Sequence, residues 1–274
     1  MSQLSRRRFI TTVTKGTASI AILGVAACSG DSGSGTSTTV TAPTSPSTTT
    51  PPPSTTTTTA TPSATAASTT AAPLGEAAFA WERVNLGNVS AYILERSGEA
   101  VLVDTGLGGS AGDIEEALGR LGLAWGNLGH IILTHRHGDH VGSIDAVMAA
   151  APDATGYIGE GDAAAVAAPR PLTILNGGDA VFDLDIIATP GHTPGSISVF
   201  DPIGRVLVSG DAVLGGGEPG SVAGASPRFS QDMVAADQSV IALAPLQPSA
   251  ILPGHGEPVT VDAATKLAAL AASL

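Results

Sequence analysis

The spacing of hydrophobic and polar positions predicts alternating strands and helices from about residue 79 onward. Two β-rich runs, 79–86 and 89–95, flank a turn signal formed by Gly87 and Asn88, and together they predict a hairpin. Many strands bounded by Gly and Pro turns, with helices between them, indicate an α+β domain whose sheets are covered by helices. The same pattern predicts further strands at 100–103, 130–134, 154–158, 184–189, 196–200, 205–209 and 250–252, and helices at 112–121, 141–151, 161–168, 231–243 and 262–274.

Composition confines this domain to residues 74–274 and sets residues 29–73 apart. Residues 29–73 are almost entirely Ser, Thr, Pro, Ala and Gly, so they have few large apolar side chains to bury. Because so little burial cannot offset the conformational entropy of ordering, we expect a disordered tether. The later residues are rich in Ala, Val, Leu, Ile and Gly without a second linker, which predicts one domain.

Residues 1–28 carry targeting signals. Arg6 and Arg7 precede an apolar run over 16–27, which ends in small residues before Cys28, the single cysteine of the sequence. This order resembles a twin-arginine export signal followed by a lipoprotein cleavage site, and the apolar run is too short for a spanning helix. We expect export and a lipid anchor on Cys28 at the outer face of the cytoplasmic membrane. The alternative is an uncleaved amphipathic N-terminus.

Charge limits the kind of partner. From residue 74 onward the chain has eight Lys and Arg against 23 Asp and Glu, a formal charge of −15. An acidic domain repels phosphate backbones and gains nothing from counterion release. We expect a small-molecule substrate, no nucleic-acid partner, and membrane contact through the lipid anchor only.

The most informative segment is His135-Arg136-His137-Gly138-Asp139-His140, which follows a predicted strand and precedes a predicted helix. In extended backbone, alternate side chains share a face, so His135 and His137 can bind one ion. A turn at Gly138 lets Asp139 and His140 face a neighbouring position. Imidazole and carboxylate are ligands that suit zinc and similar divalent metals.

Three later segments place His192, Asp211 and His255 after an apolar strand or in a Gly/Pro loop. Together with the HxHxDH segment, this order resembles the metallo-β-lactamase superfamily, and the resemblance covers residues 79–260. It implies that superfamily's fold, a four-layer αβ/βα sandwich of two mixed sheets flanked by helices. A metal-free scaffold, in which these side chains only form caps and turns, is the alternative.

The resemblance also implies a role for each residue. His135, His137 and His192 would bind one metal ion, Asp139, His140 and His255 a second, and Asp211 would bridge the two. Asp104 would orient a ligand histidine without binding metal, as carboxylates behind metal-bound histidines commonly do. His130 starts a strand outside any of these motifs, so we expect it to be a structural or surface residue.

Two metal ions about 3.5–4 Å apart can share a bound water and lower its pKa toward about 7, which supplies a hydroxide nucleophile. We therefore expect a hydrolase with two zinc ions that attacks an ester, lactone, thioester or related acyl bond. Asp211 and Asp139 are the catalytic candidates, the latter for proton transfer after attack. Other divalent metals would also suit these ligands.

Two alternatives remain open. A mononuclear iron persulfide dioxygenase would use His135, His192 and Asp211, since two histidines and one carboxylate leave iron positions free for oxygen. A lipoprotein that binds metal or a ligand without turnover is the other. The absence of cysteine after residue 28 disfavours β-lactamases with a cysteine ligand, and Leu214 stands where acyl-homoserine lactonases often have tyrosine. A Gly-rich loop over 214–228 is long enough to cover the metal centre.

Overall fold

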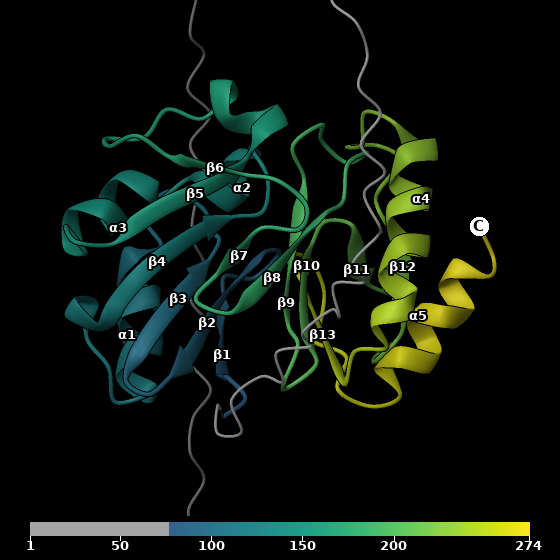
Figure 1. Ribbon diagram of the computed structural model, residues 1–274, viewed down its shortest axis with the longest axis horizontal. Helices are drawn as coiled ribbons and strands as arrows, with labels where there is room; N and C mark the ends of the chain where they lie inside the picture. Colours follow the sequence, from purple (N-terminus) through teal and green to yellow (C-terminus); the bar gives the residue numbers. More distant parts are fainter. Residues whose placement is uncertain (1–76) are drawn as a thin grey trace, which may run out of the picture. The chain divides into compact units, whose positions relative to one another are not determined.

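The computed structural model describes residues 77–274 (Figure 1). The predicted signal, the predicted lipidation site Cys28, the expected tether over 29–73 and the rest of the chain before residue 77 lie outside the described residues. These assignments therefore stay predictions. Within residues 77–274, no helix has the length and apolar character needed to span a membrane.

Six strands form the first sheet, in the order β1-β2-β3-β4-β5-β6. The strands β1 to β3 pair antiparallel, as the predicted opening hairpin requires, and β3 to β6 pair parallel. Their bounds are β1 Ala80–Asn85, β2 Ser90–Arg96, β3 Glu99–Val103, β4 Leu128–Leu133, β5 Thr155–Gly159 and β6 Thr173–Leu175.

Five strands form the second sheet, in the order β13-β10-β9-β8-β7. Here β10 and β13 pair parallel, whereas the other neighbours pair antiparallel, so both sheets are mixed. A separate hairpin joins β11 Val213–Gly215 to β12 Val222–Gly224. The second sheet comprises β7 Ala180–Val181, β8 Leu184–Ala188, β9 Ile197–Asp201, β10 Val206–Gly210 and β13 Ala250–Pro253.

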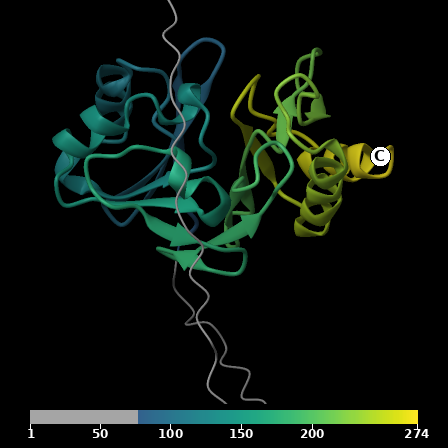
Figure 2. The ribbon, with the colours of Figure 1, turned by 90° about the horizontal axis from the view of Figure 1, so that it is seen from above.

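Helices cover the outer face of each sheet (Figures 1 and 2). On one side lie α1 and α3, and on the other lie α4 and α5, which gives four layers. This confirms the predicted α+β sandwich. The helices are α1 Ala111–Arg120, α2 Gly138–Val141, α3 Ile144–Ala150, α4 Met233–Leu243 and α5 Ala263–Ala271, with 3-10 turns η1 Trp125–Asn127, η2 Glu160–Ala165 and η3 Ala244–Leu246.

Three hydrophobic clusters fill the three interfaces between these layers. In β3, Val101 and Val103 face the second sheet, whereas Leu102 packs under the first pair of helices. Ile251 of β13 packs with Leu243 of α4 in the third cluster. Because both faces of the central strands are buried, their sequences are continuously apolar instead of alternating with polar residues.

Two predicted helices differ from the structure. The helix expected over 141–151 is divided into α2 and α3, because Gly142 and Ser143 pack against the loop before α1: Gly142 N–H donates to Gly106 O, and Ser143 Oγ accepts from Ser110 N. The helix expected over 161–168 is the short 3-10 turn η2. A Cβ at Gly161 would lie 2.7 Å from the backbone of Pro194, so tertiary contact overrides the helix propensity of its alanines.

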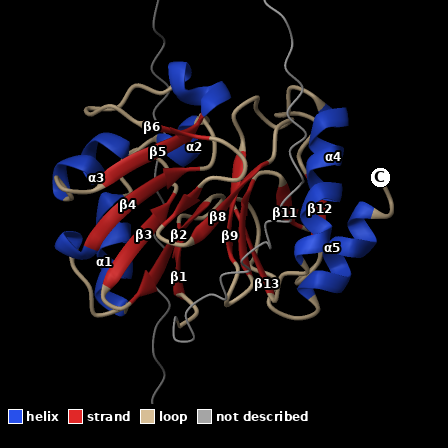
Figure 3. Cartoon of the chain, in the orientation of Figure 1, coloured by secondary structure: helices blue, strands red, loops and turns tan. Residues whose placement is uncertain are grey.

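Four short strands were not predicted, namely β6, β7, β11 and β12 (Figure 3). Each has only two or three residues, which is too short for a period of two to be recognised. The pair β11 and β12 occupies most of the segment 214–228, which was expected to be a loop. That segment is therefore a hairpin followed by a turn.

Candidate metal centre

The predicted ligands converge where several strands end at one edge of the two sheets. The chain leaves β4 directly into His135 and His137, leaves β10 into Asp211, and leaves β13 into the loop with His255. Three mutually close sets of ligand atoms result. They are His135, His137 and His192, named group A; Asp139, His140 and His255, named group B; and His135, His140 and Asp211.

Group A is compact. Nε2 of His135 lies 3.1 Å from Nδ1 of His137, and that atom lies 2.9 Å from Nε2 of His192. His135 and His192 are buried, whereas His137 is half-buried toward the cavity described below. Three ring nitrogens that face one another at these separations can serve as ligands of a single ion.

Group B lies beside group A. Nε2 of His255 is 3.4 Å from Oδ2 of Asp139 and 3.4 Å from Nε2 of His140. Asp139 and His140 both belong to α2, so the turn after His137 aims them at this second position, as the sequence predicted. His140 is fully buried, and the other two side chains are partly exposed.

Asp211 lies between the two groups. Its Oδ2 is 3.3 Å from Nε2 of His192 in group A and 3.3 Å from Nε2 of His255 in group B. Its Oδ1 faces Nε2 of His140 at 3.4 Å and is buried without a hydrogen-bond donor among the described residues. A buried carboxylate oxygen without a donor is costly, and a metal ion at this position would satisfy it.

The outer nitrogens of the histidines are held by oxygen atoms, which fixes the direction of the inner ones. His140 Nδ1 meets Asp104 at 2.8 Å, and His255 Nδ1 meets the carbonyl oxygen of Asn88. An acceptor at Nδ1 requires the proton there, so Nε2 points into the site as a lone pair.

Two hydroxyls hold the outer nitrogens of two histidines of group A, His135 and His192. Thr134 Oγ1 donates to Asp104 at 2.8 Å, and Ser230 Oγ donates to the carbonyl oxygen of Ser226 at 2.8 Å. Each hydroxyl has only one proton, so each accepts from the adjacent ring, namely Nδ1 of His135 at 3.0 Å and Nδ1 of His192 at 3.1 Å. Lone pairs that face one another across a few ångström repel without a cation, so these residues fit a bound metal.

Asp104 closes this network from the end of β3. Its backbone has a φ of +64°, a conformation that non-glycine residues seldom adopt, and the turn aims its carboxylate at the start of α2. Oδ1 accepts from Thr134 N at 2.7 Å, and Oδ2 accepts from both Thr134 Oγ1 and His140 Nδ1. Asp104 thus contacts the histidine it was expected to orient, and no ligand set contains it.

The protein groups alone shift the pKa values of the site strongly. Burial lowers the pKa of His192 to about 4, and burial together with the neighbouring His140 places that of His135 well below its usual range. The hydrogen bond with Asp139, followed by that with Asp211, raises the pKa of His255 to about 10. Group A therefore binds protons weakly, which favours the neutral imidazole that a metal requires.

The sequence profile of the metallo-beta-lactamase superfamily matches residues 84–255, more than half of the chain. The chain belongs to the metallo-beta-lactamase superfamily. Among relatives, the probable metallo-hydrolase YflN of Bacillus subtilis (strain 168) is 34% identical over 223 residues, covering 65% of this chain and 83% of that protein. The uncharacterized protein YobT of the same organism is 34% identical over 197 residues, covering 62% of this chain and 83% of that protein.

Among solved structures of the superfamily, the di-iron-bound form of TTHA1623 is 29% identical. It superposes with a TM-score of 0.53 and covers 67% of this chain and 92% of that chain. The metal-binding character of the His and Asp groups agrees with membership of a superfamily that binds zinc or iron.

A cavity of about 720 Å³ opens onto both groups. Leu214 from β11 and Phe229 from the turn after β12 form an apolar wall, and Phe229 is 59% exposed. The segment 214–228 therefore contributes Leu214 and Ser226 to the cavity, and Phe229 directly follows it. The lining comprises Asn88, His137, Gly138, Asp139, His192, Asp211, Leu214, Ser226, Phe229, His255 and Gly256.

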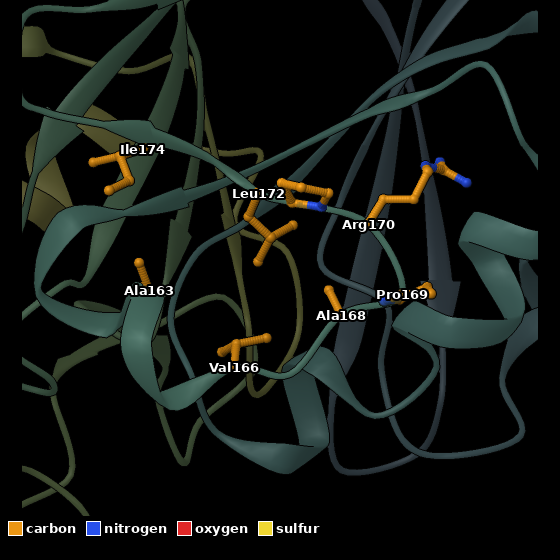
Figure 4. A pocket seen from close by; sticks show the side chains of 8 residues that line it. Ala163, Val166, Ala168, Pro169, Arg170, Leu172 and Ile174 are labelled. Atoms are coloured by element: carbon orange, nitrogen blue, oxygen red, sulfur yellow. The ribbon is translucent and has the colours of Figure 1, made fainter.

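A second hollow of about 380 Å³ lies between η2 and β6, and Figure 4 shows its lining. Its residues include no His, Cys, Asp or Glu side chain that could bind metal. The guanidinium of Arg170 instead donates to the carbonyl oxygens of Met148, Ala151 and Ala154 and so satisfies the end of α3. The side chain of Arg170 therefore has a structural role.

His130 has no part in the metal centre. Its ring stacks on Phe182 with centroids 5.6 Å apart, Nδ1 lies 3.2 Å from the hydroxyl of Tyr157, and Nε2 lies 3.4 Å from Glu99. It is the partly buried structural residue that the sequence predicted.

Sequence reasoning missed the residues that hold the ligands from behind. Ser230 and Asp162 belong to none of the predicted motifs, and Asn88 was predicted only as part of the hairpin turn. The one local signal that could have indicated Ser230 is the segment Ser-Pro-Arg-Phe-Ser at 226–230, where a proline favours a turn and an aromatic residue stands two positions later.

Proposed function

We propose that this metal-dependent hydrolase holds two zinc ions and cleaves an ester, lactone, thioester or related acyl bond. His135, His137 and His192 would bind one ion, Asp139, His140 and His255 the other, and Asp211 would bridge them. The observation that carries the proposal is the position of Asp211, whose Oδ2 lies equally far from a histidine of each group. A carboxylate has two oxygens that can face two ions, and a neutral side chain does not.

Such a pair of ions, once bound, supplies an activated water and polarises a carbonyl group. The residues of the chain hold and orient the reactants. Asp139 lines the cavity, and the hydrogen bond with His255 keeps its pKa well below the usual range, so its carboxylate is ionised at neutral pH. We assign to it the acceptance and relay of a proton during turnover.

The cavity favours a substrate with an apolar, uncharged group beside the scissile bond. None of the described residues that line it is Lys or Arg. Arg83 Nη2 donates to the carbonyl oxygen of Gly256 at 2.9 Å, and the guanidinium of Arg228 lies 5.3 Å from the ring centroid of Phe229, but neither arginine is part of the lining. Leu214 and Phe229 offer apolar surface, and Asn88 and Ser226 offer polar contacts, as small-molecule sites commonly do.

The test is a substrate panel with purified protein, loaded in parallel with Zn²⁺ or with Fe²⁺. Esters, lactones and thioesters with neutral alkyl or aryl groups should be hydrolysed at the same rate with and without oxygen. Turnover confined to a persulfide, with consumption of oxygen, would identify the iron dioxygenase instead. Metal binding without turnover on any substrate class would identify a binding protein.

We further propose that the protein is exported and lipid-anchored on Cys28. The support is the sequence order of Arg6, Arg7, the apolar run and Cys28. Replacing both arginines with lysine should leave precursor in the cytoplasm, measured by cell fractionation. Export at the parent level would rule out the twin-arginine route.

A further inference from the structure

Asp162 is a fully buried carboxylate outside every predicted motif. It lies in η2, and its four hydrogen-bond contacts reach two loops far apart in sequence. Oδ2 accepts from the backbone N–H of Arg136 at 3.0 Å and from Thr193 Oγ1 at 2.5 Å. Oδ1 accepts from Gly195 N at 3.2 Å and from Arg136 Nη1 at 3.3 Å.

These contacts fall beside the three ligands of group A. Arg136 stands between His135 and His137, and Thr193 directly follows His192. One carboxylate therefore ties together the two loops that carry group A. Group B has no such connection to Asp162 among the interactions of the described residues.

The loop after His192 approaches η2 so closely that Gly195 leaves no room for a side chain. A Cβ at Gly195 would lie 2.3 Å from the backbone nitrogen of Asp162 and 2.8 Å from its Cβ. The η2 turn therefore packs directly against the loop after His192. Burial of an unpaired carboxylate would be costly, and the guanidinium of Arg136 supplies the opposite charge.

We propose that Asp162 is a positioning residue that fixes His135 and His137 relative to His192 and so determines metal affinity at group A. All four partners of its oxygens are N–H or O–H donors. Each oxygen accepts from both loops, so an amide in place of the carboxylate, whichever way it is oriented, turns one acceptor into a donor and removes one hydrogen bond to each loop. The inference rests on the proposed metal ligands but not on the proposed reaction.

The experiment uses two variants, each of which keeps only one of the two ligand groups complete. His255→Ala leaves group A as the complete set, and His192→Ala leaves group B. Co²⁺ affinity and the visible spectrum of bound Co²⁺ are then measured by titration, with and without Asp162→Asn. We expect Asp162→Asn to weaken Co²⁺ binding by about 10- to 100-fold and to change the spectrum in the first background. In the His192→Ala background, Asp162→Asn should change Co²⁺ affinity by less than about threefold.

Asp201 offers a matched control. It is also fully buried, and its oxygens accept from Phe79 N at 3.1 Å and Ile203 N at 2.9 Å, away from the ligand loops. Asp201→Asn should lower the melting temperature without changing Co²⁺ affinity in either background. Equal weakening by the two Asn variants would show that Asp162 acts only through stability and would overturn the proposal.

Thr193→Val is the milder variant if Asp162→Asn fails to fold. It removes one of the two donors at Oδ2 and should weaken Co²⁺ binding in the same direction, in the His255→Ala background only. Unchanged affinity and spectrum in that variant would also overturn the proposal. A parent protein that binds no Co²⁺ would contradict the proposed ligands, and with them this role of Asp162.

Discussion

Oδ2 of Asp104 lies 2.8 Å from Nδ1 of His140, and both groups are buried. This contact directs Nε2 of His140 into group B. It also contributes to the raised pKa of His140: burial acts to lower this pKa, but the carboxylate of Asp104, together with those of Asp211 and Asp139, raises it above the usual value.

The Asp104→Asn variant tests this relationship. Oδ1 must accept from Thr134 N, so the amide nitrogen would take the position of Oδ2 and donate toward His140 Nδ1. His140 would then carry its proton on Nε2, where it blocks the metal. We expect zinc affinity to fall by about 10- to 100-fold, measured by competition with a chelator.

Asp183→Asn is the control for that variant. Asp183 is 60% exposed in its ion pair with Arg96 and belongs to none of the three ligand sets. Its replacement should leave zinc affinity unchanged. Asp104→Asn protein with the parent affinity would mean that His140 does not depend on Asp104 for its orientation.

Gly254 is a second sensitive position. A Cβ there would lie 2.4 Å from Oδ1 of Asp211 and 2.7 Å from Cε1 of His140, so neither side chain could keep its place. Gly254→Ala should therefore lower the metal content of purified protein, measured by elemental analysis. Gly119→Ala, on the exposed face of α1 with no atom within 4 Å of the added carbon, should retain full metal content and gain roughly 0.5–1 kcal/mol of stability.

Phe229 should contribute to substrate binding without contributing much to stability. Its ring lines the cavity and is 59% exposed. Phe229→Ala should raise KM for esters with large apolar groups by about tenfold, the effect of ~1.4 kcal/mol, and leave the melting temperature nearly unchanged. Val234→Ala on α4, where the side chain is 74% exposed outside the cavity, should alter neither quantity. A Phe229→Ala protein that keeps the parent KM for esters with large apolar groups would exclude Phe229 from the substrate site.

A chain that starts at Leu74 should fold and retain hydrolysis. The residues of the metal centre all lie at or beyond Asn88, and the segment before residue 74 has few apolar side chains to contribute to a core. Circular dichroism and turnover of the shortened protein provide the check. Loss of folding would mean that the preceding segment packs on the domain.

The fold and the ligands could be predicted because their signals are local. The run Ala100–Val103 in β3 is continuously apolar, and His135 to His140 follow the next strand, β4, at fixed spacing. The supporting residues carry no such signal. Ser230 meets His192 across 38 positions and Asn88 meets His255 across 167, and only tertiary packing brings them together.

The division between α2 and α3 also results from tertiary contacts between residues that are distant in sequence. The pattern over 141–151 is helical, but Ser143 Oγ accepts from Ser110 N, 33 positions away. The role of Asp162 could not be predicted from the neighbouring sequence either. The Ala-rich run that contains it predicts an exposed helix and gives no indication of a buried carboxylate. Contacts between distant loops decided each of these features.

The measurement that tests the account most directly is the metal content of the parent protein and of Asp211→Ala. Because Asp211 faces a histidine of each group, the account predicts about two zinc ions per chain in the parent, and a joint loss of zinc and hydrolysis in the variant. A parent protein with one iron per chain that consumes oxygen on a persulfide would contradict it.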